Sequence, residues 1–150
     1  MKVFVDADAC PVKQEIVSVA SKYHFEVVFV ASYNHLSDKK YGGDWVFVDT
    51  GKEAADLYIV NNVRKNNVVV TQDIGLAGLL LKKDVHIVTP RGKQYTEHNI
   101  ETALQFRYLS AKERRRGKYL KGPKRFTDED LLNFITTFEK MLSKLAGDLK

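Results

Sequence analysis

The sequence predicts a single α/β domain built on a doubly wound, five-stranded parallel sheet with a C-terminal helical extension. Up to about residue 90, short runs of Val, Ile and Phe alternate with helical patterns, as in parallel sheets wound by helices. After residue 90 the patterns are helical only. The chain has 150 residues, the size of one ordinary domain. We therefore expect an α/β core over residues 1–90 and a basic helical extension over residues 91–150.

Five apolar runs are expected to form the strands. Each run is short and rich in Val, Ile or Phe, which is typical of strands that are buried on both faces of a parallel sheet. The polar, glycine-bearing segment 32–44 separates the second run from the third and is expected to be a surface loop. The predicted strands are residues 2–6, 25–31, 45–49, 67–71 and 85–89.

Helix start signals follow three of these strands. Pro11 is placed at the first position of a helix, Thr50-Gly51-Lys52-Glu53 has the spacing of a capping box, and Asp73 is placed as an N-cap. In the extension we expect helices over residues 96–116 and 127–146. The favoured interpretation of the apolar stripe on the last helix is packing on the domain's own sheet, and a homodimer seam is the alternative. The stripe consists of Leu131, Ile135, Phe138, Leu142 and Leu145.

The first strand runs directly into two carboxylates, Asp6 and Asp8. Ligands of open α/β sheets bind beyond the carboxyl ends of the strands, so both acids are delivered to the edge where active sites lie. Residues two apart on an extended segment point the same way, and a cation or a proton must then separate their charges. One of the two acids could instead cap the following helix. The pair predicts a divalent metal site.

Two further acids are placed to join this pair. Asp73 ends the fourth strand, which commonly lies beside the first strand at the switch point of a doubly wound sheet. Asp56 lies on the second helix, three residues after Glu53. Taken singly, these acids are explained as caps or solvated helix residues. Together they predict an oxygen-only pocket for Mg²⁺ or Mn²⁺, formed by Asp6, Asp8, Asp56 and Asp73.

The net charge of +5 is concentrated in the extension, where basic residues are interleaved with aromatic ones. Lys and Arg neutralise phosphates, and aromatic rings stack on bases, so this segment fits a single-stranded nucleic acid. A solvated charged face is the alternative. The predicted phosphate-binding residues are Arg91, Arg114, Arg115, Arg116, Lys124 and Arg125.

Composition excludes several other classes of protein. The longest apolar runs are shorter than the ~20 residues that span a membrane, and the chain enters a strand at once rather than a signal segment, so we expect a cytoplasmic protein without a membrane partner. The single cysteine, Cys10, leaves no intrachain disulfide. A thiol near a helix start can act as a nucleophile, but a buried hydrophobic role is the favoured interpretation.

Acids at the ends of neighbouring strands, together with a basic segment, predict metal-dependent cleavage of phosphodiesters with Asp6, Asp8 and Asp73 as catalytic residues. Two alternatives stay open. A strand that ends in Asp-Ala-Asp is also typical of haloacid-dehalogenase phosphatases, in which Asp6 would be phosphorylated and Asp8 would shuttle the proton. A protein of this fold could also bind RNA or another protein without turnover.

Several motifs follow one another in order over nearly the whole chain. They are Asp6-Ala7-Asp8-Ala9-Cys10-Pro11-Val12, Ala55-Asp56, Thr71-Gln72-Asp73, Pro90-Arg91-Gly92, Arg114-Arg115-Arg116-Gly117 and Gly122-Pro123-Lys124-Arg125-Phe126-Thr127. In this order they resemble the bacterial YaiI/YqxD family. That functionally uncharacterised family looks like a branch of the PIN-like domains, many of which are metal-dependent ribonucleases.

The resemblance implies a PIN-like fold, RNA rather than DNA as substrate, and metal binding by Asp6, Asp56 and Asp73. Asp8 is a candidate replacement for the acid or hydroxyl that often follows in PIN domains, where this chain has Ile74-Gly75-Leu76.

Overall fold

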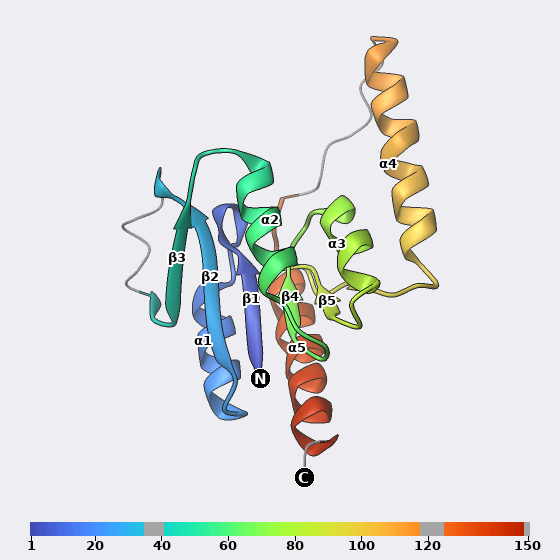
Figure 1. The fold of residues 1–150 in the computed structure, drawn as a ribbon. Helices are drawn as coiled ribbons and strands as arrows, with labels where there is room; N and C mark the ends of the chain where they lie inside the picture. The colour runs from blue at the N-terminus through green and yellow to red at the C-terminus, as the bar shows by residue number, and fades with distance from the viewer. Residues whose placement is uncertain (35–40, 118–124, 149–150) are drawn as a thin grey trace.

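The structure is a computed structural model that describes residues 1–34, 41–117 and 125–148. In these residues the centre of the fold is a sheet of six strands, of which β1 to β5 are labelled in Figure 1. The strands are β1 (Lys2–Asp6), β2 (Glu26–Ser32), β3 (Asp44–Val48), β4 (Val68–Val70), β5 (His86–Val88) and β6 (Gln94–Tyr95). They lie in the order β3-β2-β1-β4-β5-β6, and the pairs from β3 to β5 are parallel. The five predicted strands and the predicted pairing of the first with the fourth are confirmed.

The prediction of a purely parallel, five-stranded sheet is wrong at one edge, because β6 pairs antiparallel with β5. Between the two strands Gly92 has a φ of 89°, a left-handed conformation that favours glycine. The turn is closed by two backbone hydrogen bonds, from Gly92 N–H to Thr89 O at 2.9 Å and from Thr89 N–H to Lys93 O at 2.8 Å. A strand of two residues is too short to form an apolar run, so the sequence pattern misses it.

The helices begin close to where the sequence places them, with two differences in capping. Asp73 caps α3 as predicted, because its Oδ1 accepts a hydrogen bond from the Leu76 N–H at 3.1 Å. Pro11 lies two residues before α1, in the preceding turn. The N-cap of α2 is Gly51, which has no side chain to accept a bond, so the predicted capping box over residues 50–53 does not form. The helices are η1 (Ala7–Ala9, a 3₁₀ turn), α1 (Lys13–Lys22), α2 (Lys52–Asn62), α3 (Ile74–Leu81), α4 (Ile100–Arg115) and α5 (Asp128–Asp148).

Helices cover both faces of the sheet (Figure 1). α1 and α5 form one buried cluster with alternate residues of the strands, centred on Phe29, Phe134 and Phe138. α2 and α3 form a second cluster on the opposite face, centred on Ile59 and Leu80. Because both faces are covered, the central strands are apolar between their end residues, which explains the continuous Val, Ile and Phe runs in the sequence.

α5 carries the apolar stripe expected on the last helix, and this stripe packs on the sheet. Phe138 and Leu142 are 0% exposed, and Leu145 is 6% exposed. The favoured interpretation, packing on the chain's own core, is confirmed. The homodimer stays a prediction, and its interface would have to use a different surface from this stripe.

The start of α5 is fixed by a reciprocal cap and an ion pair. The Thr127 N–H donates to Asp130 Oδ2 at 3.0 Å, and the Asp130 N–H donates to Thr127 Oγ1 at 3.1 Å. Arg91 Nη1 donates to the same Asp130 oxygen at 2.7 Å, which ties the β5–β6 turn to the helix. At Gly92 a Cβ would lie 2.6 Å from the Asn133 backbone carbon, so the turn and helix approach too closely for any other residue.

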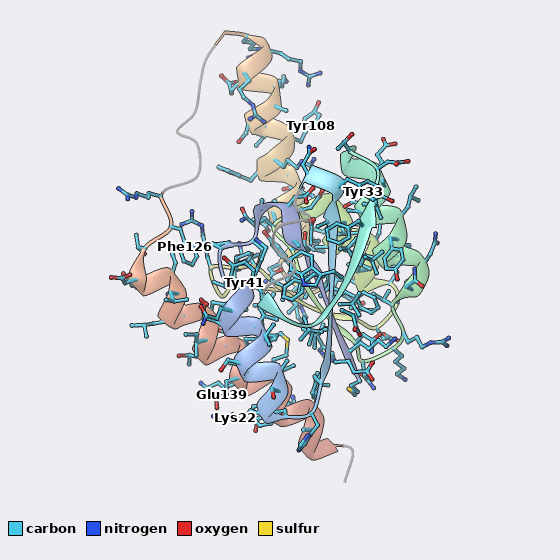
Figure 2. The ribbon with its side chains drawn as sticks, turned by 90° about the vertical axis from the view of Figure 1, so that its left-hand side faces the viewer. Lys22, Tyr33, Tyr41, Tyr108, Phe126 and Glu139 are labelled. Carbon is cyan, nitrogen blue, oxygen red and sulfur yellow. The ribbon has the colours of Figure 1, made fainter. Side chains whose placement is uncertain are left out.

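α4 is packed far less than α5. Ile100, at its start, is 8% exposed, but Phe106, Tyr108 and Leu109 are 67%, 62% and 56% exposed. Figure 1 shows α4 standing away from the sheet beyond α3, and Figure 2 shows Tyr108 on this projecting helix. α4 begins four residues later than predicted because residues 96–99 form a turn, in which the Thr96 N–H donates to the Asn99 side chain at 2.9 Å.

An aromatic row crosses β2 and β3 at the edge of the sheet. Trp45 stacks on Phe29 with ring centroids 4.5 Å apart and lies 5.8 Å from Phe47, which in turn lies 6.2 Å from Tyr33. The predicted loop at residues 32–44 is shorter than expected, because β2 includes Ser32 and β3 includes Asp44, and residues 35–40 lie outside the described part. No helix of the described ranges is both long and apolar enough to cross a bilayer.

Candidate functional site

A cleft of about 450 Å³ opens at the carboxyl ends of β1 and β2, next to the point where the strand order reverses between β1 and β4. This reversal is the switch point at which open α/β sheets bind ligands. Chain segments from three places line it: the end of β1 with η1, the end of β2, and the start of α2. The lining residues are Asp6, Asp8, Ala9, Ser32, Asn34, Thr50, Gly51, Ala55 and Asp56. The cleft therefore gathers three of the four predicted acids.

Asp6 is the last residue of β1, and a neighbouring strand fixes its side chain. The Thr71 hydroxyl, which follows β4 and is 1% exposed, donates a hydrogen bond to Asp6 Oδ2 at 3.1 Å. Because β1 and β4 are paired, with Val5 opposite Val70, their next residues meet at the sheet edge. This hydrogen bond fixes the orientation of the Asp6 carboxyl group at the edge of the cleft.

Asp8 reaches the same cleft by a different route from the one predicted. The expected extended segment ends at Asp6, and residues 7–9 turn into η1, so Asp6 and Asp8 do not share a strand face. Asp8 is instead held across the sheet edge, where its Oδ1 accepts a hydrogen bond from the Ser32 backbone N–H at 2.9 Å. Ser32 is the last residue of β2. Each strand next to β1 therefore positions one acid: Thr71, after β4, holds Asp6, and Ser32 of β2 holds Asp8.

Asp56 lines the cleft from the first turns of α2. Ala55 and Ile59 of this helix are 7% and 0% exposed and face the sheet. Asp56, next to Ala55, lies half-buried at the border of that face. Glu53, three residues earlier, is exposed and is not among the residues that line the cleft. Of the two acids that the sequence places on this helix, only Asp56 joins Asp6 and Asp8 there.

Asp73 lies next to the cleft but does not line it. Its side chain caps α3, and its backbone N–H donates to Thr71 Oγ1 at 3.0 Å. The Thr71 hydroxyl therefore bridges Asp73 and Asp6. The predicted proximity of these two acids is confirmed, while the single four-acid pocket is not, because capping turns the Asp73 carboxylate toward α3. The Arg107 guanidinium lies 3.6 Å from this carboxylate.

The donor set of the cleft suits a hard, hydrated cation. Within the described ranges no three His, Cys, Asp or Glu side chains stand close enough together to hold a metal ion directly. Mg²⁺ retains several water ligands and is commonly bound through one or two carboxylates. Asp6 and Asp8, from the end of β1 with η1, and Asp56, from α2, supply such carboxylates in a cleft large enough for the water ligands. Oxygen-only donors fit Mg²⁺ or Mn²⁺ better than Zn²⁺.

The predicted phosphate-binding arginines of α4 lie at its projecting end. Arg114, Arg115 and Arg116 are exposed, and Arg116 Nη1 lies 3.8 Å from Glu113 Oε1, a contact of the kind common between exposed neighbours on a helix. Figure 1 shows that this end of α4 lies well away from the strands. These cations therefore lie away from the residues that line the cleft, and phosphate binding by them stays a prediction.

The other predicted cations lie near the start of α5. Arg91 is engaged with Asp130, and its guanidinium lies 5.7 Å from the centroid of the Phe126 ring, which Figure 2 places just before α5. Arg91 therefore has a structural role in the described fold, and phosphate binding by this residue stays a prediction. Arg125 is exposed. Lys124 lies outside the described residues.

Cys10 is a packed core residue. It is 5% exposed, and burial raises the pKa of its thiol to about 11. A thiol with this pKa is protonated at neutral pH and is a poor nucleophile. The favoured interpretation of Cys10 as a small buried hydrophobic residue is confirmed.

The sequence analysis did not place Ser32, Thr71 or Arg107 at this site, although Thr71 belongs to the Thr71-Gln72-Asp73 motif. Thr71 and Ser32 follow or end strands adjacent to β1, and polar residues at these positions are the sequence signal that could have identified them. Arg107 belongs to a helix 34 residues after Asp73, and nothing in its local pattern shows that it returns to the sheet edge.

Together the fold and the cleft define an α/β protein with an acidic site at the switch point of a mostly parallel sheet. A family model described as "Uncharacterized BCR, YaiI/YqxD family" matches residues 4–144. The chain therefore belongs to the YaiI/YqxD family, as its motifs indicate.

Relatives of the chain carry names without a stated activity. It is 50% identical over 148 residues to the UPF0178 protein Bcer98_3021 of Bacillus cytotoxicus, covering 99% of this chain and 97% of the relative. It is 52% identical over 147 residues to the UPF0178 protein RBAM_023530 of Bacillus velezensis, with 97% and 87% covered. The UPF0178 protein Lin1493 of Listeria innocua is 50% identical over 142 residues, with 93% and 97% covered. No solved structure matches the chain.

Proposed function

We propose that this protein is a metal-dependent nuclease of PIN-like fold that cleaves RNA in the cytoplasm. The observation that carries the proposal is the convergence of Asp6, Asp8 and Asp56 on one cleft at the switch point. A cleft of carboxylates suits a divalent cation, and the basic residues of the extension suit a phosphate backbone. Mg²⁺ or Mn²⁺ is the proposed cofactor.

In this proposal the acids of the cleft bind the ion, and hydrogen bonds from neighbouring residues fix the side chains of these acids. One or two of the carboxylates of Asp6, Asp8 and Asp56 would ligate it directly, the others would contact its water ligands, and Asp73 would lie next to them. When bound, such an ion lowers the pKa of a water ligand and stabilises the leaving oxygen of a phosphodiester. The Thr71 hydroxyl and the Ser32 N–H fix the carboxylates of Asp6 and Asp8, which reduces the reorganisation needed when the substrate arrives.

The basic end of α4 would bind substrate away from the cleft. Arg114, Arg115 and Arg116 are exposed on a helix that projects from the body, and Phe106 and Tyr108 are exposed on the same helix. Guanidinium groups contact phosphates, and rings stack on bases that are not paired, so single-stranded RNA fits this helix best.

Incubation with labelled single-stranded RNA and the matching DNA tests this function directly. With Mn²⁺ or Mg²⁺ we expect RNA products from the wild type, none in chelator, and a loss of rate of about 100-fold in Asp6→Asn. Asp84→Asn is the matched control, because Asp84 lies in the turn before β5, at the opposite end of the strands. Metal-dependent products that are equally abundant from wild type and Asp6→Asn would refute the assignment.

The same experiment separates the two alternatives. A phosphatase that uses Asp6 as nucleophile would leave the RNA chain intact, and beryllofluoride would be trapped on Asp6. A module that only binds RNA would retain binding in chelator, with a steep dependence on salt, and would form no products.

A further inference from the structure

Arg107 is the point at which the projecting helix α4 meets the acidic edge of the sheet. Its Nη1 lies 3.6 Å from Asp73 Oδ1. The Arg107 side chain is 48% exposed, whereas the Asp73 side chain is 9% exposed. The carboxylate is therefore a fixed group, and the guanidinium reaches in to it from the surface.

Gly75 leaves the space that this contact needs. A Cβ at position 75 would lie 3.0 Å from Arg107 Nη1 and 3.3 Å from Asp73 Oδ1, so a side chain there would crowd both groups from one side. The guanidinium is the end of a flexible side chain and would give way. Gly78, one turn later on α3, has no such role, because its Cβ would make an ordinary contact with Leu104 at 3.8 Å.

The contact continues from Asp73 to the cleft. The Asp73 N–H donates to Thr71 Oγ1 at 3.0 Å, and the Thr71 hydroxyl donates to Asp6 Oδ2 at 3.1 Å. Asp73 Oδ1 is also the cap of α3. Arg107 is thus linked through two residues to the acid at the end of β1, without lining the cleft itself.

We propose that Arg107 is a positioning residue that aligns the basic end of α4 with the cleft, so that one RNA strand contacts both. The inference rests on the proposed function. α4 has few other contacts beyond its first turns, where Phe106, Tyr108 and Leu109 are exposed, so its direction depends on the contacts near its base. At about 1.5 Å per residue, Arg115 lies about 12 Å further along the helix than Arg107, and a small tilt displaces it by several ångströms.

The ion pair between Arg107 and Asp73 is not expected to stabilise the fold. A half-exposed pair at this distance contributes little to the free energy of unfolding, because water and salt screen it. Its effect is geometric, and the proposal therefore predicts a loss of turnover with little loss of stability or of binding to the helix cations.

Cleavage and binding assays on five proteins test the alignment: the wild type, Arg107→Gln, Arg107→Lys, Gly75→Ala and Gly78→Ala. We expect kcat for single-stranded RNA to fall about tenfold in Arg107→Gln and Gly75→Ala, with KM and binding in chelator changed less than about twofold. Arg107→Lys should recover part of the rate, and Gly78→Ala should match the wild type. Both alanine substitutions favour the helix, so neither is expected to unfold the protein.

A distance measurement tests the same inference without any cleavage. In a Cys10→Ala background, which removes the single cysteine, Leu57→Cys on α2 and Arg115→Cys on α4 place spin labels on two exposed positions. We expect the distribution of distances between the labels to broaden in Gly75→Ala and Arg107→Gln and to stay narrow in Gly78→Ala.

The two readouts separate failure of this inference from failure of the proposed function. If no variant cleaves RNA, the nuclease is refuted, and broadening confined to Gly75→Ala and Arg107→Gln still supports alignment of α4 by Arg107. If the label distances are the same in all variants, or if Gly75→Ala and Gly78→Ala have equal kcat, the positioning role of Arg107 is overturned.

Discussion

The two helices of the extension, α4 and α5, differ in what holds them in place. α5 buries Phe134, Phe138 and Leu142 completely against the sheet and α1. α4 buries little beyond Ile100 and exposes large apolar residues along its length. The two helices of the basic extension therefore differ in role: α5 is part of the core, whereas the side chains of α4 are exposed to solvent.

The two helices also differ in how their first turns are capped, since only α5 has side-chain capping bonds at its start. Thr127 and Asp130 form a reciprocal cap on α5, and Arg91 adds an ion pair from the β5–β6 turn. Asn99, the N-cap of α4, makes no capping bond to its helix, and its side chain bonds the backbone of Gln94 and Thr96 instead. α5 is therefore fixed at its start and along its face, whereas α4 is anchored near its base.

Truncation of one phenylalanine on each helix should give the largest difference between α4 and α5, measured as the loss in the free energy of unfolding. Phe138→Ala leaves a cavity in the core, and we expect it to lower the free energy of unfolding by about 3–5 kcal/mol. Phe106→Ala on α4 should change it by less than about 0.5 kcal/mol, because that ring is already in water. Urea denaturation followed by circular dichroism measures both. Comparable losses in the two variants would show that α4 is packed in solution.

Removing two cations from each helix sharpens the comparison for RNA binding. We expect Arg114→Gln with Arg115→Gln on α4 to weaken binding of single-stranded RNA about tenfold near 0.1 M salt, and to reduce the salt slope by about 1.4. Lys140→Gln with Lys144→Gln removes the same charge from α5 and should have little effect. Fluorescence anisotropy in chelator measures both proteins, and equal losses would mean that binding follows net charge rather than α4.

The smallest effect concerns the cap of α5. Thr127→Ala removes one of the two capping bonds and should lower the free energy of unfolding by about 1 kcal/mol. The cap also gives a pH dependence, because the Thr127 N–H, and then its hydroxyl and Arg91, hold the pKa of the Asp130 carboxyl below its usual value. A depressed pKa stabilises the fold at neutral pH, and this contribution is lost as the pH falls through the lowered pKa.

Asp130→Asn isolates this pH dependence. The wild type should unfold at a higher urea concentration than Asp130→Asn at neutral pH, and the difference should shrink below about pH 4 as the carboxylate takes up a proton. Glu101→Gln, in the first turn of α4, is the matched change on the other helix and should show a smaller difference. A constant gap between wild type and Asp130→Asn from pH 7 to 3 would contradict the assignment.

Much of the α/β core follows from the sequence because its signals are local. Runs of Val, Ile and Phe identify β1 to β5, since strands covered on both faces need apolar residues at every position. The adjacency of Asp6 and Asp73 follows from the usual strand order at a switch point. β6 was missed because two residues, Gln94 and Tyr95, carry no periodicity and are paired only through the turn at Gly92.

The details of the site depend on contacts that no local pattern records. The predicted strand geometry for Asp8 is wrong because η1 turns the chain directly after Asp6. Capping directs Asp73 away from the cleft, although its place after β4 was predicted correctly. The contact of Arg107 with Asp73 joins α4 to the N-cap of α3, and it lies beside Gly75, where a Cβ would be 3.0 Å from the guanidinium.

The aromatic row on β2 and β3 supplies an optical reporter. The chain contains one tryptophan, and Trp45 stacks on Phe29 with its indole N–H bonded to the Gly42 carbonyl at 2.8 Å. All of the indole emission therefore arises from one position beside β2, the strand whose last residue, Ser32, holds Asp8 in the cleft. Titration with metal or nucleotide, followed by this intrinsic fluorescence, would show whether occupancy of the cleft changes the surroundings of Trp45, with no dye attached.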